Sequence, residues 1–213
     1  MITNKTRLNV INRIYLYIVC LDEIVQKKSS LRECRQQIKD YKYYLLSNIL
    51  GTPITRNEIG YTEKGKPFVR NKNFSFSISH SKEYYAIVWI NEKIELGLDI
   101  ESLSRRVNLD IIKKTLSNRE WSDFVSNGQK TTDFLFFWTQ KESFIKAKAL
   151  SVYTGVNDLE FEIIEYGAKS YLAISKYDNQ IYRMIPFRLY NQIGMICCGS
   201  VKIDTFEIIE KIS

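Results

Sequence analysis

The clearest pattern in the chain is an alternation of apolar and polar residues between positions 74 and 102. Apolar residues recur at every second position in FSFSISHS (74–81) and in ELGLDIES (95–102), and YYAIVWI (84–90) is rich in aromatic and β-branched residues. Because side chains alternate between the two faces of a strand, these patterns predict three successive strands. We expect ELGLDIES to continue the sheet that the first two strands form.

Helical spacing of apolar residues predicts two long helices, one in each half of the chain. The first covers residues 29–50, which begin with two serines and are followed by Gly51, a typical helix stop. The second covers residues 133–150, with Asp133 as the expected N-cap.

Shorter helices and strands are predicted around these elements. A helix is expected from Asn108, and Ser117 and Glu120 have the spacing of a capping box. Further strands are expected at residues 14–21, 159–164, 170–175, 181–189 and 193–200, and a strand pair around a turn at residues 59–69. The fold class is therefore α+β, and we place the domain boundary in SLSRRV (102–107), between an N-terminal half (1–102) and a C-terminal half (103–213).

Composition and charge narrow the class of protein. Of the 213 residues 45% are hydrophobic and 13% aromatic, which is ample for a packed core. The net charge of +7 favours an anionic partner such as nucleic acid, an acidic membrane, a phosphate-rich ligand or an acidic protein. A zinc site is not expected, since the chain has one histidine and its cysteines form no CxxC pair (Cys20, Cys34, Cys197 and Cys198). Free thiols fit the cytoplasm, and Asp22 and Glu23 argue against a signal sequence at 14–21.

Asp99 and Glu101 are the first residues that suggest chemistry. They lie two positions apart on one strand, so both carboxylates project from the same face and repel each other. The ordinary explanation is a strand exit where the acids meet Arg105 and Arg106. The alternative is a site for Mg²⁺, which prefers carboxylate, water and phosphate oxygens.

A second set of polar residues lies on the predicted helix at 133–150. Trp138, Glu142 and Lys146 follow one another at i, i+4 steps and so share one side of the helix. An ordinary Glu142–Lys146 ion pair would explain the charges, whereas beside a pair of acids Glu142 could complete a metal site and Lys146 could bind a phosphate. His80, between Ser79 and Ser81, is a further phosphate donor or else a surface histidine.

Three motifs in this order resemble the 4′-phosphopantetheinyl transferases of the surfactin-type, two-domain group. FSFSISHS resembles F-N-[IV]-S-H-S, GLDIE (97–101) resembles G-[IV]-D-[IV]-E, and WTQKESFIK (138–146) resembles W-[ST]-x-K-E-[AS]-x-x-K, with GKP (65–67) upstream. Three features depart from the pattern. The family has an asparagine near Phe76, which is flanked here by Ser75 and Ser77; Ala149 stands where a glycine is expected; and the loop SVYTG is shorter than expected.

The resemblance implies a fold of two similar α/β halves packed as a pseudo-dimer, with coenzyme A between them, in a protein that we expect to be a monomer. It implies transfer of the 4′-phosphopantetheine group of coenzyme A to a serine of an apo acyl or peptidyl carrier protein, with release of adenosine 3′,5′-bisphosphate. The cofactor would be Mg²⁺, with Mn²⁺ as a substitute.

The resemblance also implies roles for individual residues. Asp99, Glu101 and Glu142 would hold the metal ion, and Lys146 would bind the pyrophosphate. Glu142 would be the base for the incoming serine, directly or through a water molecule. The residues expected to contact coenzyme A are Lys66, Ser79, His80 and Lys146, together with a basic residue among Arg35, Lys39 and Lys42 for the 3′-phosphate. Glu120 matches an acid of the family, but capping explains it equally well.

Two other functions compete with this interpretation. A basic nucleic-acid-binding module would fit the charge, but its basic residues are scattered and the acidic motifs would have no role. A relative that only binds carrier proteins would not need Asp99, Glu101, Glu142 and Lys146 together. We therefore expect neither a nucleic acid nor a membrane as a partner.

Overall fold

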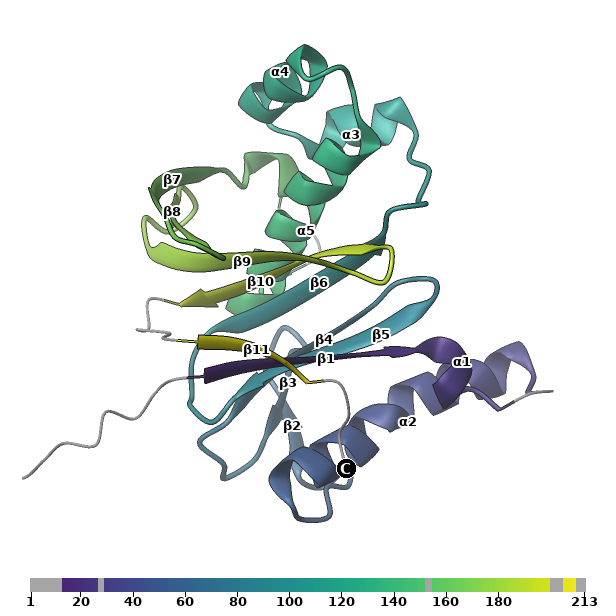
Figure 1. The fold of residues 1–213 in the computed structure, drawn as a ribbon. Coiled ribbons are helices and arrows are strands. Elements are labelled where there is room, and N and C mark those ends of the chain that lie inside the picture. Colours follow the sequence, from purple (N-terminus) through teal and green to yellow (C-terminus); the bar gives the residue numbers. More distant parts are fainter. Residues whose placement is uncertain (1–12, 27–28, 152–154, 200–204, 210–213) are drawn as a thin grey trace, which may run out of the picture.

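The structure is a computed structural model that describes residues 13–26, 29–151, 155–199 and 205–209. Helices and strands are mixed along the chain, as the α+β prediction requires (Figure 1). The strands form a four-stranded sheet in the order β11-β1-β5-β4, a five-stranded sheet in the order β6-β10-β9-β8-β7, and the pair β2-β3.

The first sheet contains strands from both ends of the sequence. Its strands are β1 (Arg13–Cys20), β4 (Ser75–His80), β5 (Tyr84–Ile90) and β11 (Thr205–Ile209). The strand predicted at 14–21 is confirmed as β1, which is antiparallel to β5 and parallel to β11. Strand β11 was not predicted. The pair β2 (Ile59–Tyr61) and β3 (Pro67–Val69) confirms the turn predicted at 59–69.

Strand β6 (Leu96–Ser102) corrects the predicted sheet order. It does not continue the first sheet but pairs with β10 (Gln192–Gly199), antiparallel and in register over its whole length. The second sheet is completed by β7 (Phe161–Tyr166), β8 (Tyr171–Ser175) and β9 (Ile181–Leu189), and these strands agree with the predicted pattern. The chain therefore passes from one sheet to the other between β5 and β6.

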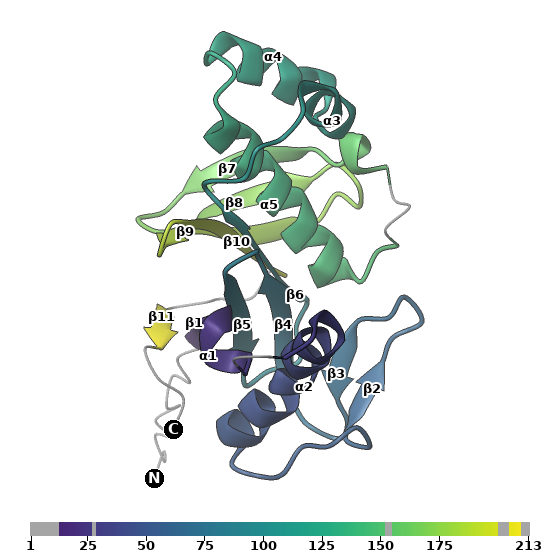
Figure 2. The same ribbon diagram turned by 90° about the vertical axis from the view of Figure 1, so that its right-hand side faces the viewer.

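One hydrophobic core joins the two sheets. It receives alternate side chains of β1, β5, β6, β9 and β10, among them Leu16, Val88, Leu98 and Ile196, which are all fully buried. The opposite faces of the two sheets pack against helices. Side chains of α2 (Leu31–Leu50) cover the first sheet, and side chains of α5 (Thr131–Lys148) cover the second (Figure 2).

The two long helices have the predicted positions, with one difference at an N-terminus. Helix α2 begins after Ser30, which forms a capping box with Glu33, and it ends at the left-handed Gly51. Helix α5 begins after Lys130, so Asp133 lies in the first turn and is not the N-cap.

The shorter helices are α1 (Leu21–Ile24), α3 (Leu109–Thr115), α4 (Asn118–Ser126) and a 3₁₀ turn at Val156–Asp158. Asn108 caps α3 and the Ser117–Glu120 capping box opens α4, as predicted. In the described part of the chain, no helix combines the length and the apolar character that crossing a membrane requires.

Candidate active site

The face of β6 that carries the two acids lies against helix α5. Gly97 begins this face, and a Cβ atom added there would meet the carbonyl oxygen of Ser143 at 1.9 Å. Only glycine therefore allows the helix backbone to approach the strand so closely. Asp99 and Glu101 follow on the same face, while Leu96, Leu98 and Ile100 enter the core between the sheets, as the alternation predicted.

Three serines of β4 attach that strand to β6 and to the residues just before it. The hydroxyl oxygens of Ser77 and Ser79 accept hydrogen bonds from the backbone N–H groups of Leu98 and Ile100 at 3.0 and 3.3 Å. Ser75 accepts one from Ile94 at 2.9 Å. Without these acceptors, the buried N–H groups at the edge of β6 would have no partner from β4. A buried N–H group without a partner lowers the stability of the fold. We call this contact the serine seam (Ser75, Ser77 and Ser79).

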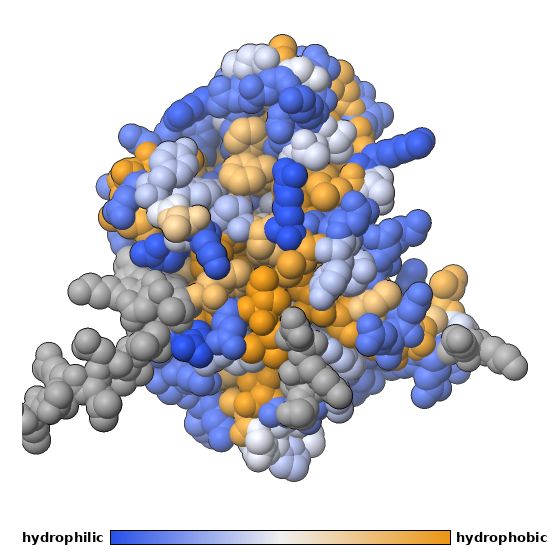
Figure 3. Space-filling view, in the orientation of Figure 1, coloured by the Kyte–Doolittle hydropathy of each residue, from blue (hydrophilic) through white to orange (hydrophobic). Residues whose placement is uncertain are grey.

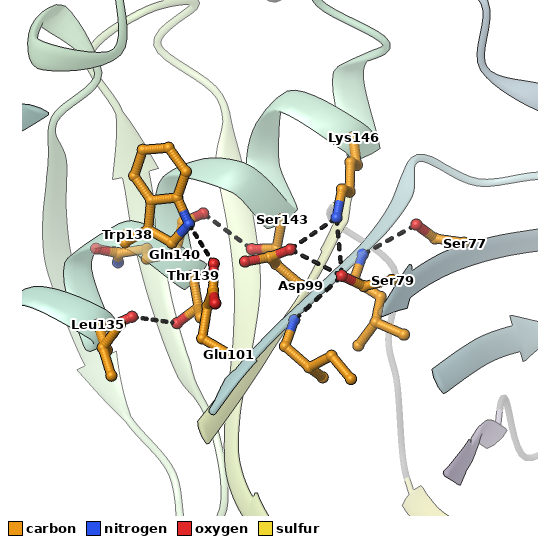
Figure 4. Close-up of polar contacts among 12 residues, drawn as sticks. Ser77, Ser79, Asp99, Glu101, Leu135, Trp138, Thr139, Gln140, Ser143 and Lys146 are labelled. Atoms are coloured by element: carbon orange, nitrogen blue, oxygen red, sulfur yellow. Dashed lines mark hydrogen bonds and ion pairs between the residues drawn. The ribbon is translucent and has the colours of Figure 1, made fainter. Parts of the chain in front are cut away.

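Asp99 is the point where β4, β6 and α5 meet. Its Oδ1 atom accepts hydrogen bonds from Lys146 Nζ at 2.7 Å and from Ser79 Oγ at 2.9 Å (Figure 4). Lys146 also donates to Ser79 Oγ at 3.0 Å. Asp99 is only 5% exposed, so burial strengthens the attraction between its carboxylate and the Lys146 ammonium. The ion pair of Lys146 is thus made with Asp99.

Glu101 is held from two sides. Its Oε1 atom accepts a hydrogen bond from the indole N–H of Trp138 at 2.9 Å and forms an ion pair with Arg105. The Arg105 guanidinium lies 5.6 Å from the centre of the Trp138 ring. The pairing with Arg105 that the sequence suggested is therefore confirmed for Glu101, and Trp138 reaches the acid although its ring also packs against the core.

Glu142 lies between Trp138 and Lys146 on α5 and is half-buried. Burial and the negative charge of Asp99 raise its pKa, while Lys146 and Arg105 oppose the rise. Burial and Asp99 raise the pKa of Glu101 in the same way. The carboxylate of Asp99 therefore acts on both glutamates, and Lys146 and Arg105 oppose its effect on each of them.

The donor set of this site fits a divalent cation. The Oδ2 atom of Asp99 is buried and has no hydrogen-bond partner among the described residues. A buried carboxylate oxygen beside two further acids is the kind of ligand that Mg²⁺ prefers. In the side-chain arrangement of the described residues, no three His, Cys, Asp or Glu side chains converge as a complete metal site. The metal role of Asp99, Glu101 and Glu142 stays a prediction.

Lys66 and His80 lie toward opposite ends of the serine seam. Lys66 Nζ donates to the carbonyl oxygens of Leu96 and Ala147 at 3.0 and 2.7 Å, and its side chain lines a cavity of about 540 Å³. His80 ends β4 and is exposed. The contacts with coenzyme A expected of these two residues and of Ser79 stay a prediction.

The three basic residues predicted for the 3′-phosphate all belong to α2. Lys42 donates to the hydroxyl of Tyr61 on β2 at 2.9 Å, and Arg35 and Lys39 are exposed. Their role stays a prediction. Of the short loop SVYTG, residues 152–154 lie outside the described part of the chain.

Lys141 is a residue whose role the sequence did not reveal. Its side chain is fully buried in α5, pairs with Glu120 at 2.6 Å, and donates to the carbonyl oxygens of Thr115 and Val156. Glu120 thus both caps α4 and neutralises a buried lysine. The signal for Lys141 was its place in WTQKESFIK, at a helix position where a lone charge needs a partner.

Cavity size does not identify the site. A cavity of about 810 Å³ lies between β9, β11 and the β7–β8 turn, and its lining includes none of the acids or lysines described above. Hydrophobic side chains gather in the middle of the molecular face that β9 and β11 present (Figure 3).

Comparison with known proteins identifies the family of the segment that contains the site. Residues 95–187 match the sequence model of the 4′-phosphopantetheinyl transferase superfamily. This segment, which carries Asp99, Glu101, Glu142 and Lys146, therefore belongs to that superfamily, and the resemblance drawn from the motifs is confirmed. GKP and the histidine motif precede the matched range.

Individual relatives agree with this assignment. The chain is 30% identical to human L-aminoadipate-semialdehyde dehydrogenase-phosphopantetheinyl transferase over 56% of its own length and 43% of the relative's. It is 30% identical to the 4′-phosphopantetheinyl transferase gsp of Aneurinibacillus migulanus (62% and 54%) and 37% identical to the 4′-phosphopantetheinyl transferase of Bacillus subtilis (44% and 42%). The aligned segments thus span about half the length of these relatives.

Proposed function

We propose that the protein transfers the 4′-phosphopantetheine group of coenzyme A to a serine of an apo acyl or peptidyl carrier protein. The observation that carries the proposal is the convergence of Asp99, Lys146 and Ser79 from three elements, beside Glu101 and Glu142. A buried acid with an unpaired oxygen and an adjacent lysine suits a pyrophosphate together with its counter-ion. The net charge of +7 favours acidic carrier proteins.

In the proposed reaction the carrier serine hydroxyl attacks the β-phosphorus of coenzyme A. The new bond joins the serine oxygen to phosphorus, the pyrophosphate P–O bond breaks, and adenosine 3′,5′-bisphosphate leaves with the bridging oxygen. Glu142 accepts the serine proton, and Lys146 orients the pyrophosphate. Bound between Asp99, Glu101 and Glu142, Mg²⁺ would offset the negative charge of the phosphates.

The topology supports a pseudo-dimer. In each of two three-stranded units the first strand is followed, after shorter helices, by a long helix, and a later strand (β5 or β10) pairs with both the first strand and the strand before it. The order is β1-β5-β4 in one unit and β6-β10-β9 in the other. The second unit begins with β6, which precedes the predicted boundary at 102–107, and β11 returns from the C-terminal end of the chain to pair with β1 of the first unit. We propose that these units are the two similar halves and that the protein acts as a cytoplasmic monomer.

The first test is transfer itself. Incubation with coenzyme A, Mg²⁺ and a panel of apo carrier proteins should add one phosphopantetheine mass to a carrier, measured by intact-protein mass spectrometry. A chelator should stop the reaction, and Mg²⁺ or Mn²⁺ should restore it. Modification of no carrier in the panel would favour a non-catalytic relative, and full activity in excess chelator would exclude the metal.

A paired substitution tests the site. Asp99→Asn keeps the side-chain shape but removes the buried charge, so we expect turnover to fall about a hundredfold or more. The matched control is Asp123→Asn on the exposed surface of α4, which should behave like the parent. Normal turnover in the Asp99 variant would reject the assigned site.

A further inference from the structure

Lys66 connects two segments that are remote from it in sequence. Its ammonium donates to the carbonyl oxygen of Leu96, at the start of β6, and to that of Ala147, in the last turn of α5, at 3.0 and 2.7 Å. Lys66 itself directly precedes β3, in the turn of the β2–β3 pair. One side chain of the N-terminal half thus holds a strand and a helix of the second sheet together. We call these two bonds the carbonyl clasp.

The Ala147 carbonyl needs such a partner because it lies in the last turn of a helix. The final carbonyl groups of a helix have no intrahelical partner and carry partial negative charge. Here the N–H of Ala149 bonds the carbonyls of Ile145 and Lys146, so those groups are satisfied locally. The next carbonyl group, that of Ala147, receives its hydrogen bond from Lys66, which lies outside the helix.

The clasp adjoins the residues assigned to the reaction. Ala147 follows Lys146 directly, and Leu96 precedes Gly97, where α5 and β6 are in backbone contact. A small rotation of the last turn of α5 would therefore move the Lys146 ammonium, which bonds Asp99 at 2.7 Å. Lys148, in the same turn, pairs with Glu95 at 2.8 Å and anchors the other side.

We propose that Lys66 is a positioning residue, whose carbonyl clasp fixes the last turn of α5 on β6 and so sets the place of Lys146 at the site. This role in turnover rests on the proposed function, but the clasp itself is a property of the protein without ligand. It differs from the ligand contact expected for Lys66, since two of the three ammonium protons are donated to the protein.

The pKa of Lys66 provides a second, independent measurement of its burial at the carbonyl clasp. Burial lowers its pKa to about 8, and the titratable groups that act on it are Glu95 and Cys197, which oppose the shift. A neutral lysine amine keeps two N–H donors, so the clasp persists after deprotonation. Between pH 8 and 10.5 the unfolded chain binds a proton that the folded chain does not. Stability of the parent should therefore rise with pH in this window relative to a Lys66→Met variant.

The test in the absence of ligand compares Lys66→Met with Lys66→Arg and with Lys64→Met, an exposed lysine of the same turn. Amide hydrogen exchange is measured at Ala149 and Leu150, whose N–H groups close the end of α5. We expect exchange about tenfold to a hundredfold faster in Lys66→Met, as expected for lost hydrogen bonds to a charged group. Exchange rates in Lys66→Arg, whose guanidinium still has a donor for each of the two carbonyl oxygens, should stay near those of the parent. The Lys64→Met control should also exchange like the parent.

If Lys66→Met does not fold, Lys66→Gln replaces it, since its shorter amide can reach at most one carbonyl and should give intermediate exchange. Parent-like exchange in the variant that is measured would overturn the clasp.

Turnover then separates positioning from ligand contact. Single-turnover transfer at saturating coenzyme A should be at least about tenfold slower in Lys66→Met, or in Lys66→Gln if that variant replaces it. A weaker affinity for coenzyme A, with unchanged exchange and unchanged saturating rate, would make Lys66 a ligand contact and overturn the proposal. If the parent transfers nothing to any carrier, the proposed function fails, but the exchange and pH measurements still decide whether the clasp exists.

Discussion

Ala149 ends helix α5 in a backbone conformation that glycine adopts more easily. Its φ angle is +52°, in the left-handed region where a side chain meets the neighbouring carbonyl. The sequence analysis had already marked Ala149 as a departure, because the family pattern that the motifs resemble leads one to expect glycine there. The backbone adopts the left-handed conformation despite the methyl group, so we expect the alanine to cost stability at this turn.

We therefore expect Ala149→Gly to stabilise the protein by about 0.5–1 kcal/mol, the relief of the left-handed strain less the added entropy of the unfolded chain. The comparison is Ala147→Gly within the helix, which should destabilise by more than about 1 kcal/mol, because the loss of a buried methyl group adds to the cost of glycine in a helix. Urea unfolding measures both free energies. If the Ala149→Gly variant were less stable than the parent, the strain would have to be released elsewhere.

For individual residues, sequence patterns predicted which side chains share a face of a strand or helix, but not all of the groups that these side chains contact. The alternation in GLDIE placed Asp99 and Glu101 together, and helical spacing placed Glu142 and Lys146 on one side of a helix. Only the family resemblance brought these two sets of residues to one site. The two carbonyl bonds of Lys66 and the burial of Lys141 could not be predicted, because backbone carbonyls and distant elements leave no pattern in the residues that contact them.

Among the elements, the serine seam explains why β4 alternates serine with apolar residues. Ser77 places its hydroxyl where Leu98 presents a backbone N–H at 3.0 Å, and both residues are buried. The side chain thus provides the hydrogen bond that a neighbouring strand would otherwise supply.

Ser77→Ala leaves that N–H without its acceptor, so we expect a loss of about 1–3 kcal/mol in the free energy of unfolding. Ser122→Ala, on the exposed surface of α4, should change it by less than about 0.5 kcal/mol. Chemical denaturation measures both. Equal stabilities would mean that water or a shift of β4 replaces the bond.

Element types and limits followed well from the sequence, but the partner of β6 did not. The alternation of apolar residues shows which face of a strand is buried, but it does not show which strand lies along each edge. The apolar residues of β6 could equally have covered a continued first sheet. The neighbour is instead selected by β10, whose own alternate residues enter the same core.

For the whole molecule, the shared core implies that the two halves unfold together. Buried residues of β1 and β5 pack against those of β6, β9 and β10 in one cluster, so separating the sheets would expose both inner faces at once. The sequence predicted two halves but could not reveal that they share a core, because the contacting residues are far apart in the chain.

We expect urea unfolding to show one transition, with the same midpoint for reporters in each half. A Trp89→Phe variant reports on the second sheet through Trp121 and Trp138, and the double variant that lacks those two reports on the first sheet through Trp89. For each variant, the unfolding midpoint from fluorescence is compared with the midpoint from circular dichroism, which reports on the whole molecule. Fluorescence midpoints that differ from the dichroism midpoint would reveal halves that unfold separately.

The pairing of β1 with β11 has a consequence for synthesis on the ribosome. Strand β1 emerges early and can pair with β5 soon afterwards, but its other edge has a parallel partner only when residues 205–209 arrive. Until then the nascent chain presents an open strand edge, which readily pairs with other chains. Slow translation of the second half would therefore prolong the period in which this protein is most prone to aggregate.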